Sequence, residues 1–126
     1  MLQAEVVERM VAKAGSSDFS RLSVMLQARY DMELVLEVPP EAFDPQPKVN
    51  SAVVRMIPRR DFTLTDAQWN SLEKVVAAAF SQRRKMLRTN LSAFSDRLSL
   101  TEIELKARAQ DISVDRYIEW SKVLAS

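Results

Sequence analysis

The chain has 126 residues, of which 47% are hydrophobic and 28% charged, so it can bury a core and is not a disordered chain. The absence of cysteine and histidine excludes disulfides, thiol nucleophiles, thiolate metal sites and the commonest general base. The net charge is only +1, but residues 48–88 carry nine basic and three acidic side chains, a clustering typical of proteins that bind a polyanion.

The chain is expected to begin with two helices. Hydrophobic residues recur at helical spacing between Ala4 and Lys13, and the only glycine, Gly15, follows the end of that pattern. A second helical pattern covers residues 20–30. The start has neither the basic nor the apolar region of a signal peptide, and no apolar run is long enough to span a bilayer. We therefore expect no membrane partner and a cytoplasmic location.

Two strands are expected next, which predicts an α+β fold. Residues 32–38 alternate with period two, and residues 51–57 are rich in β-branched side chains and end at Pro58. The connection between these strands holds four of the five prolines of the chain, all within residues 39–47. A loop of this length carries a functional site more often than a tight turn does.

The proline loop is the first candidate site. Pro45 and Pro47 restrict the backbone beside Phe43, so the loop can hold an exposed ring in place next to Lys48. A positioned ring near a cation can stack an unpaired base close to a phosphate. The alternative is a ring that packs under its own loop and a lysine that is an ordinary strand-edge charge.

The rest of the chain is expected to be helical. Thr65 and Gln68 form a capping-box pattern that opens one helix, Ser99 opens another that runs to about residue 109, and a last helix covers residues 113–124. The change of pattern near residue 60 predicts a mixed domain over 1–60 and a helical subdomain over 61–126.

The densest positive charge lies within residues 82–91, which we expect to be helical. On a helical wheel, Arg84, Lys85 and Arg88 share a sector beside an apolar stripe, and Arg83 lies on the other flank. These four cations are the candidate RNA-binding residues, since exposed cations can neutralise phosphates. The alternative is a solvated charged face without a partner.

Four segments of the chain resemble the ribosomal RNA adenine N6-dimethyltransferases, and specifically the bacterial small-subunit (KsgA) type. The longest match is to a motif that occurs late in the catalytic domain of these enzymes. The others are to the strand and helix that follow the catalytic motif, a basic helix and a segment before the last helix. The four segments are Val38-Pro39-Pro40 with Phe43-Asp44-Pro45-Gln46-Pro47-Lys48-Val49-Asn50-Ser51-Ala52-Val53-Val54-Arg55, Met1 to Arg9, Gln82 to Arg88, and Arg108-Ala109-Gln110-Asp111-Ile112-Ser113-Val114.

The resemblance implies a fold and a reaction. Residues 1–60 would be the end of a Rossmann-like methyltransferase domain, with two helices and a two-stranded β pair, and residues 61–126 would be a helical RNA-binding subdomain. Family members transfer methyl groups from S-adenosylmethionine to N6 of two adjacent adenosines in small-subunit ribosomal RNA, and they act in assembly of the 30S precursor. Phe43 would then stack on the flipped adenine, with Pro45, Pro47 and Lys48 beside it.

The chain departs from the family where the cofactor binds. A glycine-rich loop, an acidic residue for the ribose and an Asn-Leu-Pro-Tyr motif are all missing, and one glycine cannot build such a loop. We therefore expect a C-terminal part of the enzyme that binds no cofactor, is inactive alone and self-associates through its exposed sheet. The rival hypothesis is a non-catalytic helical module that binds protein.

Overall fold

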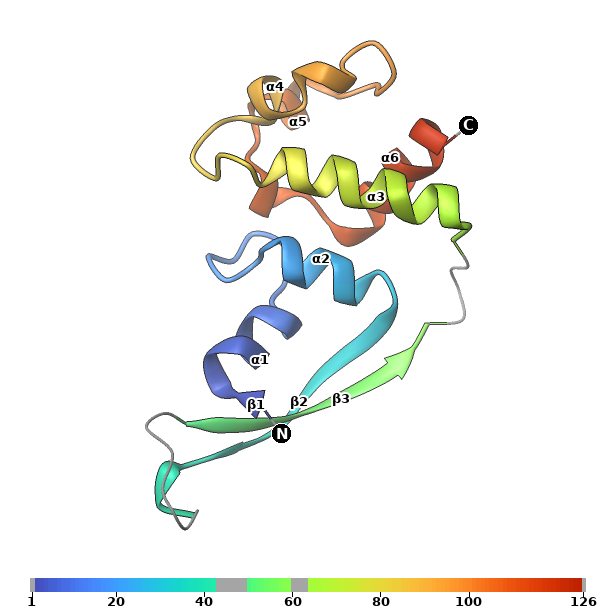
Figure 1. Ribbon diagram of the computed structural model, residues 1–126. Helices are drawn as coiled ribbons and strands as arrows, with labels where there is room; N and C mark the ends of the chain where they lie inside the picture. Colours follow the sequence, from blue (N-terminus) through green and yellow to red (C-terminus); the bar gives the residue numbers. More distant parts are fainter. Residues whose placement is uncertain (1, 43–49, 60–63, 126) are drawn as a thin grey trace.

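The computed structural model describes residues 2–42, 50–59 and 64–125 (Figure 1). A long β-hairpin backed by one helix lies at one end of the molecule, and the later helices gather at the other end. The elements in chain order are β1 (Leu2–Gln3), α1 (Ala4–Val11), α2 (Arg21–Gln27), β2 (Tyr30–Val38), the 3₁₀ helix η1 (Pro40–Ala42), β3 (Ser51–Pro58), α3 (Asp66–Ala79), α4 (Leu87–Asn90), the 3₁₀ helix η2 (Ser92–Phe94), α5 (Glu102–Lys106), the 3₁₀ helix η3 (Ala109–Asp111) and α6 (Val114–Ala125).

The sheet confirms the two predicted strands and adds a third. β3 lies in the middle, antiparallel to both β2 and β1, so the expected two-stranded pair is corrected to a three-stranded sheet. β1 pairs Leu2 with Ala52 and Gln3 with Ser51. A strand of two residues has no alternation to detect, so its existence depends on the partner strand.

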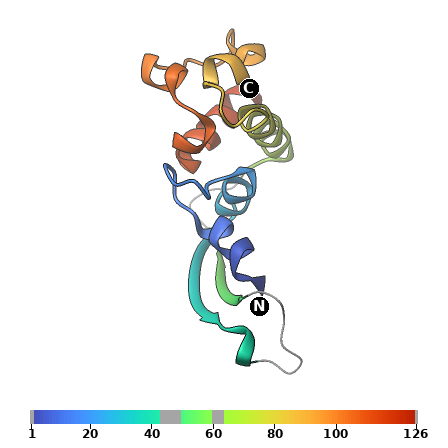
Figure 2. The same cartoon turned by 90° about the vertical axis from the view of Figure 1, so that its left-hand side faces the viewer.

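The two faces of the hairpin have different surroundings. α1 lies along one side of it, where Ala52 and Val54 pack with Val7 in a small core (Figure 2). Residues paired across an antiparallel ladder point to the same face. The opposite face therefore carries Leu36 beside Val53, Arg55 beside Glu33, and Ile57 beside Asp31. We call these six residues the outer face.

The main core joins α2 to the later helices. Phe19 and Val24 are fully buried in the same cluster as Leu72 of α3 and Tyr117 and Trp120 of α6. Aromatic rings follow one another through this core, with centroids 6.3 Å apart for Phe19 and Phe80, 6.1 Å for Phe80 and Tyr117, and 5.3 Å for Tyr117 and Trp120. Since this core draws on both sides of residue 60, the domain boundary there stays a prediction.

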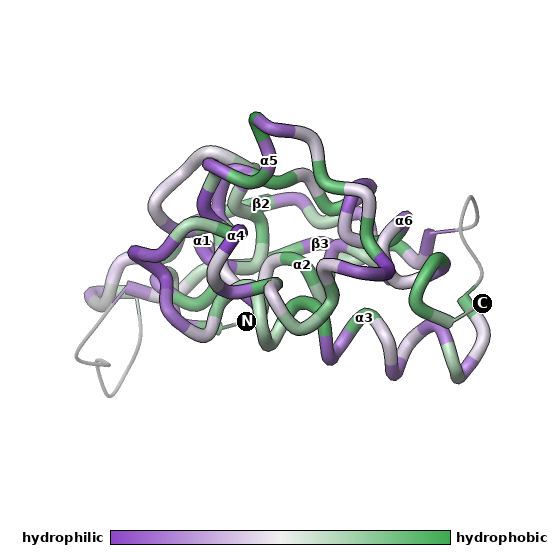
Figure 3. Tube along the Cα trace, turned by 90° about the horizontal axis from the view of Figure 1, so that it is seen from above, coloured by the Kyte–Doolittle hydropathy of each residue, from purple (hydrophilic) through white to green (hydrophobic). Residues whose placement is uncertain are grey.

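The helical tail follows the predicted caps with one shift. Thr65 caps α3, and its hydroxyl accepts a 3.1 Å hydrogen bond from the Gln68 amide. Along α3 the trace alternates between hydrophilic and hydrophobic residues (Figure 3), as its amphipathic pattern predicts. α5 is capped by Thr101 with Glu104, so the predicted start at Ser99 is wrong by two residues.

The reason for that shift is a contact from α6. Both capping patterns fit the sequence, but Arg116 donates to Glu104 at 2.7 Å and to the carbonyl of Ser99 at 3.1 Å. Glu104 is thereby held where its carboxylate also accepts from the Thr101 amide, at 3.0 Å.

Among the described helices, none has the length and apolar character needed to cross a membrane.

Candidate nucleic-acid interface

The basic segment is not the continuous helix that the sequence predicted. α3 ends at Ala79, turns follow, and only Leu87–Asn90 form the short helix α4. The Asn90 side chain donates 2.9 Å hydrogen bonds to the carbonyl of Ala79, which the end of α3 leaves open, and to that of Gln82 in the turns that follow. The Leu87 amide donates to the Ala107 carbonyl at 2.8 Å. We call residues 80–88 the basic loop.

The basic loop still separates its apolar and charged side chains. Leu87 is fully buried in the main core, and Leu91 beyond the loop is 1% exposed. The side chains of Arg84, Lys85 and Arg88 are exposed to solvent. The buried leucines therefore anchor the backbone that carries the three exposed cations. That backbone consists of turns and a short helix, whereas the sequence predicted one continuous helix.

Arg83 has different surroundings from the other three cations. Its guanidinium donates to the carbonyl of Ser17 and, at 2.7 Å, to that of Phe19. These carbonyls belong to the loop before α2, which lies next to the basic loop in Figure 1. Arg83 thus ties the two loops together, and its contribution to RNA binding stays a prediction.

The candidate residues of the proline loop, Phe43, Pro45, Pro47 and Lys48, lie outside the described residues. Its described ends are held in place. β2 and β3 pair up to Val38 and Ser51, and the amide of Ala4, which begins α1, donates to the Asn50 carbonyl at 2.8 Å. The loop therefore connects two paired strand ends, as the sequence predicts.

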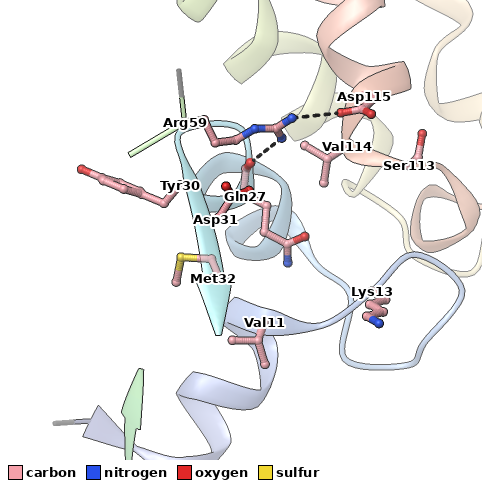
Figure 4. A pocket seen from close by; sticks show the side chains of 10 residues that line it. All are labelled: Val11, Lys13, Gln27, Tyr30, Asp31, Met32, Arg59, Ser113, Val114 and Asp115. Carbon is pink, nitrogen blue, oxygen red and sulfur yellow. Dashed lines mark hydrogen bonds and ion pairs between the residues drawn. The ribbon is translucent and has the colours of Figure 1, made fainter. Parts of the chain in front are cut away.

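A cavity of about 380 Å³ lies at the junction of the hairpin and the helices (Figure 4). The Arg59 guanidinium crosses this junction, donating to the Gln27 carbonyl at 3.0 Å and lying 3.6 Å from the Asp115 carboxylate. Two cations, Lys13 and Arg59, and two acidic residues, Asp31 and Asp115, line the cavity, so its lining charges balance. Sequence patterns missed this cavity because its walls come from five separate parts of the chain.

Two titratable groups of the helical part have structural roles. Hydrogen bonding from Arg116 holds the pKa of the Glu104 carboxyl below its usual range, and burial opposes this shift. Burial raises the pKa of Tyr117, whose hydroxyl donates to the Ala109 carbonyl at 2.7 Å. The phenol therefore stays protonated in the core and has no access to a substrate.

No cluster of acidic residues suited to a metal ion occurs in the parts of the chain that the structure describes.

Comparison with known proteins identifies the class. The model of the ribosomal RNA adenine dimethylase family matches residues 1–126, the whole chain, so the chain belongs to this family. The ribosomal RNA small subunit methyltransferase A of Burkholderia mallei (strain SAVP1) is 52% identical over 128 aligned positions, which cover all of this chain and 46% of that protein. Its counterpart from Burkholderia lata is 53% identical over the same share. The chain thus spans about half the length of these curated relatives, and the resemblance seen in the sequence is confirmed.

Solved structures support the fold. A dimethyladenosine transferase from Plasmodium falciparum superposes with a TM-score of 0.77 at 21% identity, covering 94% of this chain and 54% of that one. The 23S rRNA methyltransferase ErmE superposes with a TM-score of 0.63 at 22% identity, covering 98% of this chain and 52% of that one. At these identities the likeness concerns the fold alone.

Proposed function

We propose that this chain holds ribosomal RNA as the C-terminal part of an S-adenosylmethionine-dependent 16S rRNA adenine dimethyltransferase that also acts in small-subunit assembly. The family match over the whole chain supports this proposal, as does 52% identity to relatives named as small subunit methyltransferases. On this proposal the partners are small-subunit ribosomal RNA and the 30S precursor in the cytoplasm.

The observation that carries the proposal is the basic loop. Its three exposed cations, Arg84, Lys85 and Arg88, stand on a backbone fixed by buried Leu87 and by Asn90. Cations on a fixed backbone suit phosphates, because the backbone that carries them loses little conformational freedom when RNA binds. Arg83 contributes indirectly, by holding the loop.

The proposed base contact is Phe43. An adenine cannot be methylated at N6 while it is paired and stacked, so it must leave the helix and be held by other groups. The Phe43 ring would stack on this base, Pro45 and Pro47 would restrict the loop, and Lys48 would lie near a phosphate. The paired strand ends on both sides of the loop support this role.

The cofactor belongs to the part of the relatives that this chain does not span. The only glycine, Gly15, has a φ of +93° in a turn, and its amide already donates to the Gln110 carbonyl at 2.6 Å. A single glycine used in this way cannot form a glycine-rich nucleotide loop. The 126-residue chain alone would then bind no S-adenosylmethionine and transfer no methyl group, and measurable 1:1 binding in calorimetry would overturn this statement.

A second candidate function follows from the outer face. Leu36 is 56% exposed and Ile57 50% exposed, with the Glu33–Arg55 ion pair between them at 3.7 Å. An exposed apolar face of this kind favours association, and in a two-fold pair each copy's Glu33 could meet the other copy's Arg55. We propose that the 126-residue chain self-associates through this face. A protein-interaction module remains the rival to RNA binding.

The experiment that separates these functions is salt-dependent binding to small-subunit RNA. Replacing Arg84, Lys85 and Arg88 together by alanine should weaken binding and reduce the slope of log affinity against log salt by about 3, roughly 1 for each phosphate that is no longer neutralised. The matched control replaces Lys74, Lys106 and Lys122 together by alanine, which removes three exposed charges from the helices outside the basic loop. Unchanged affinity and slope in the triple variant would remove the basic loop from the RNA interface.

A further inference from the structure

The strand β2 lies at an open edge of the sheet. In the order β1-β3-β2 it pairs with β3 on one side only, along the nine residues from Tyr30 to Val38. Residues 33–37 are all exposed, and among the described residues no backbone hydrogen bond from outside the sheet reaches residues 30–38. An unpaired row of N–H and C=O groups is a template for a further strand.

This edge lacks most of the features that keep other chains away from strand edges. Protected edges are often short or carry lysine or proline, whereas β2 is nine residues long and has neither. The bulge between Leu34 and Leu36 does interrupt the ladder, but residues 30–34 stay in regular register with residues 54–58. Leu34, Val35 and Leu36 add exposed apolar side chains. The edge therefore offers both backbone groups and apolar contacts to a further strand.

The charge around this edge is negative. β1, α1, β2 and β3 together hold five acidic and two basic residues, and β2 itself has three acids and no cation. Both cations are paired, one with Glu5 at 3.4 Å and the other with Glu33 at 3.7 Å. In the part of the chain that the structure describes, Asp31 and Glu37 take part in no ion pair.

Neighbouring residues do not cancel this charge. Residues 43–49 and 60–63 each contain one acid and one base, so neither segment adds net charge. Two cations share the lining of the cavity at the junction with Asp31, but Arg59 is already bound to Asp115 and to the Gln27 carbonyl. The second cation, Lys13, balances one acid at most, so the edge keeps a negative charge.

The negative charge decides which partner fits the edge. It repels the phosphates of RNA. A second copy of the chain is also disfavoured, because β2 has acids near both of its ends and antiparallel pairing of two β2 strands brings like charges together. An extended segment with lysine or arginine side chains has both the backbone groups and the charge that the edge lacks.

We propose that the edge of β2 binds an extended basic peptide, which adds a strand to the sheet and sets cationic side chains beside Asp31 and Glu37. Main-chain hydrogen bonds hold such a peptide, and its alternate side chains select it. The basic loop belongs to the helices at the other end of the molecule (Figure 1), so it stays open for RNA. This inference goes beyond the proposed RNA-binding function and does not depend on it.

The test is an NMR titration of the ¹⁵N-labelled chain with three capped peptides of the same length as β2. The first peptide alternates lysine with valine, the second alternates glutamate with valine, and the third is the first with every backbone amide N-methylated. At about 90% saturation the first peptide should slow exchange of the outward-facing β2 amides roughly tenfold, because those amides then exchange only from the free state. The other two peptides should leave that exchange unchanged.

A charge-reversal variant tests the selectivity of the edge. Asp31→Lys with Glu37→Lys should weaken binding of the basic peptide at least about tenfold and favour the acidic peptide, since two attractions become repulsions. The matched control, Glu73→Lys with Glu102→Lys, reverses two exposed charges on α3 and α5 and should change neither affinity. An unchanged preference in the edge variant would contradict the role of the two acids.

The peptide series on the unmodified chain decides the proposal by itself. Protection of β2 by the basic peptide alone supports it. An equal response to the N-methylated peptide would mean attraction by charge without an added strand, and would overturn it. Protection that appears without peptide as the chain is concentrated would put a second copy at the edge, and would also overturn it, as would no protection with any peptide. RNA binding by the basic loop is tested separately by its own triple variant.

Discussion

Arg83 and Arg84 are neighbours in the sequence, yet their guanidinium groups have different surroundings. Arg83 donates to two carbonyls of the loop before α2, whereas the Arg84 side chain is exposed. A substitution at each position should therefore change a different property of the protein. The pair also offers a matched control, because the two variants differ only in position.

We expect Arg83→Met to lower the free energy of unfolding by about 1–2 kcal/mol, because two carbonyls lose a charged donor. Arg84→Met should leave that free energy within about 0.5 kcal/mol, as for most surface substitutions, and should weaken RNA binding. Urea unfolding and RNA titration of both variants measure these effects. Equal loss of stability in the two variants would contradict the different roles.

Glu104 gives a prediction for the pH dependence of stability. Its pKa in the folded chain is lowered by the Arg116 hydrogen bond, so near its ordinary value of 4.5 the unfolded chain binds more protons than the folded one. The stabilisation is present above about pH 4.5 and is lost as the pH falls through the lower folded pKa. Unfolding measured between pH 6 and pH 3 should show this loss, and Glu104→Gln should flatten it. Glu102→Gln, an exposed neighbour on α5, should not.

At the scale of elements, the Asn90 side chain bonds both the end of α3 and the basic loop. Its side chain amide donates to Ala79 and Gln82, so Asn90→Ala leaves both carbonyls without that partner. We expect this variant to lower the free energy of unfolding by about 1–3 kcal/mol and to speed amide exchange across residues 80–86. The exposed neighbour Thr89→Ala is the control. If exchange in the loop stays unchanged, Asn90 is not what fixes it.

The elements that the sequence predicts well are those determined by nearby residues. The cap of α3 depends on Thr65 and Gln68, three residues apart, and both this cap and the strand over residues 32–38 appear in the structure as predicted. The predicted alternation of buried and exposed residues is not seen along that strand, because residues 33–37 are all exposed and a bulge interrupts the pairing between Leu34 and Leu36. The exposure of Arg84, Lys85 and Arg88 is also confirmed, because the leucines beside them are strongly apolar and are buried.

The elements that the sequence does not predict depend on distant residues. No local pattern marks β1, which pairs with β3, and only the resemblance of Met1 to Arg9 to a strand and helix indicates it. The predicted helix over 82–91 is replaced by turns, which are held by bonds from Asn90 and to Ala107. The Arg29–Trp69 contact joins residues forty positions apart. Local patterns carry no information about such contacts. Phe43 and the other proline-loop candidates lie outside the described residues and stay predictions.

At the scale of the whole molecule, the outer face predicts association of the 126-residue chain. Sedimentation velocity should show a dimer that grows with concentration, because the exposed Leu36 and Ile57 are withdrawn from water in the pair. Leu36→Arg should weaken the dimer at least about tenfold, since it brings an unpaired charge into the interface. Ile103→Arg, at a position 83% exposed on α5, is the control and should leave the dimer intact. A strict monomer at high concentration would contradict the proposal.

The most direct test joins this chain to the part of the Burkholderia mallei relative that it does not match. The hybrid protein would be supplied with S-adenosylmethionine and small-subunit RNA, and N6-dimethyladenosine would be measured by mass spectrometry. We expect dimethylation of the RNA, and we expect Phe43→Ala to slow it roughly tenfold or more, the effect of removing about one stacked base, with cofactor binding unchanged. A folded hybrid that binds S-adenosylmethionine but leaves the RNA unmethylated would contradict the role of this chain as the RNA-holding part of an adenine dimethyltransferase.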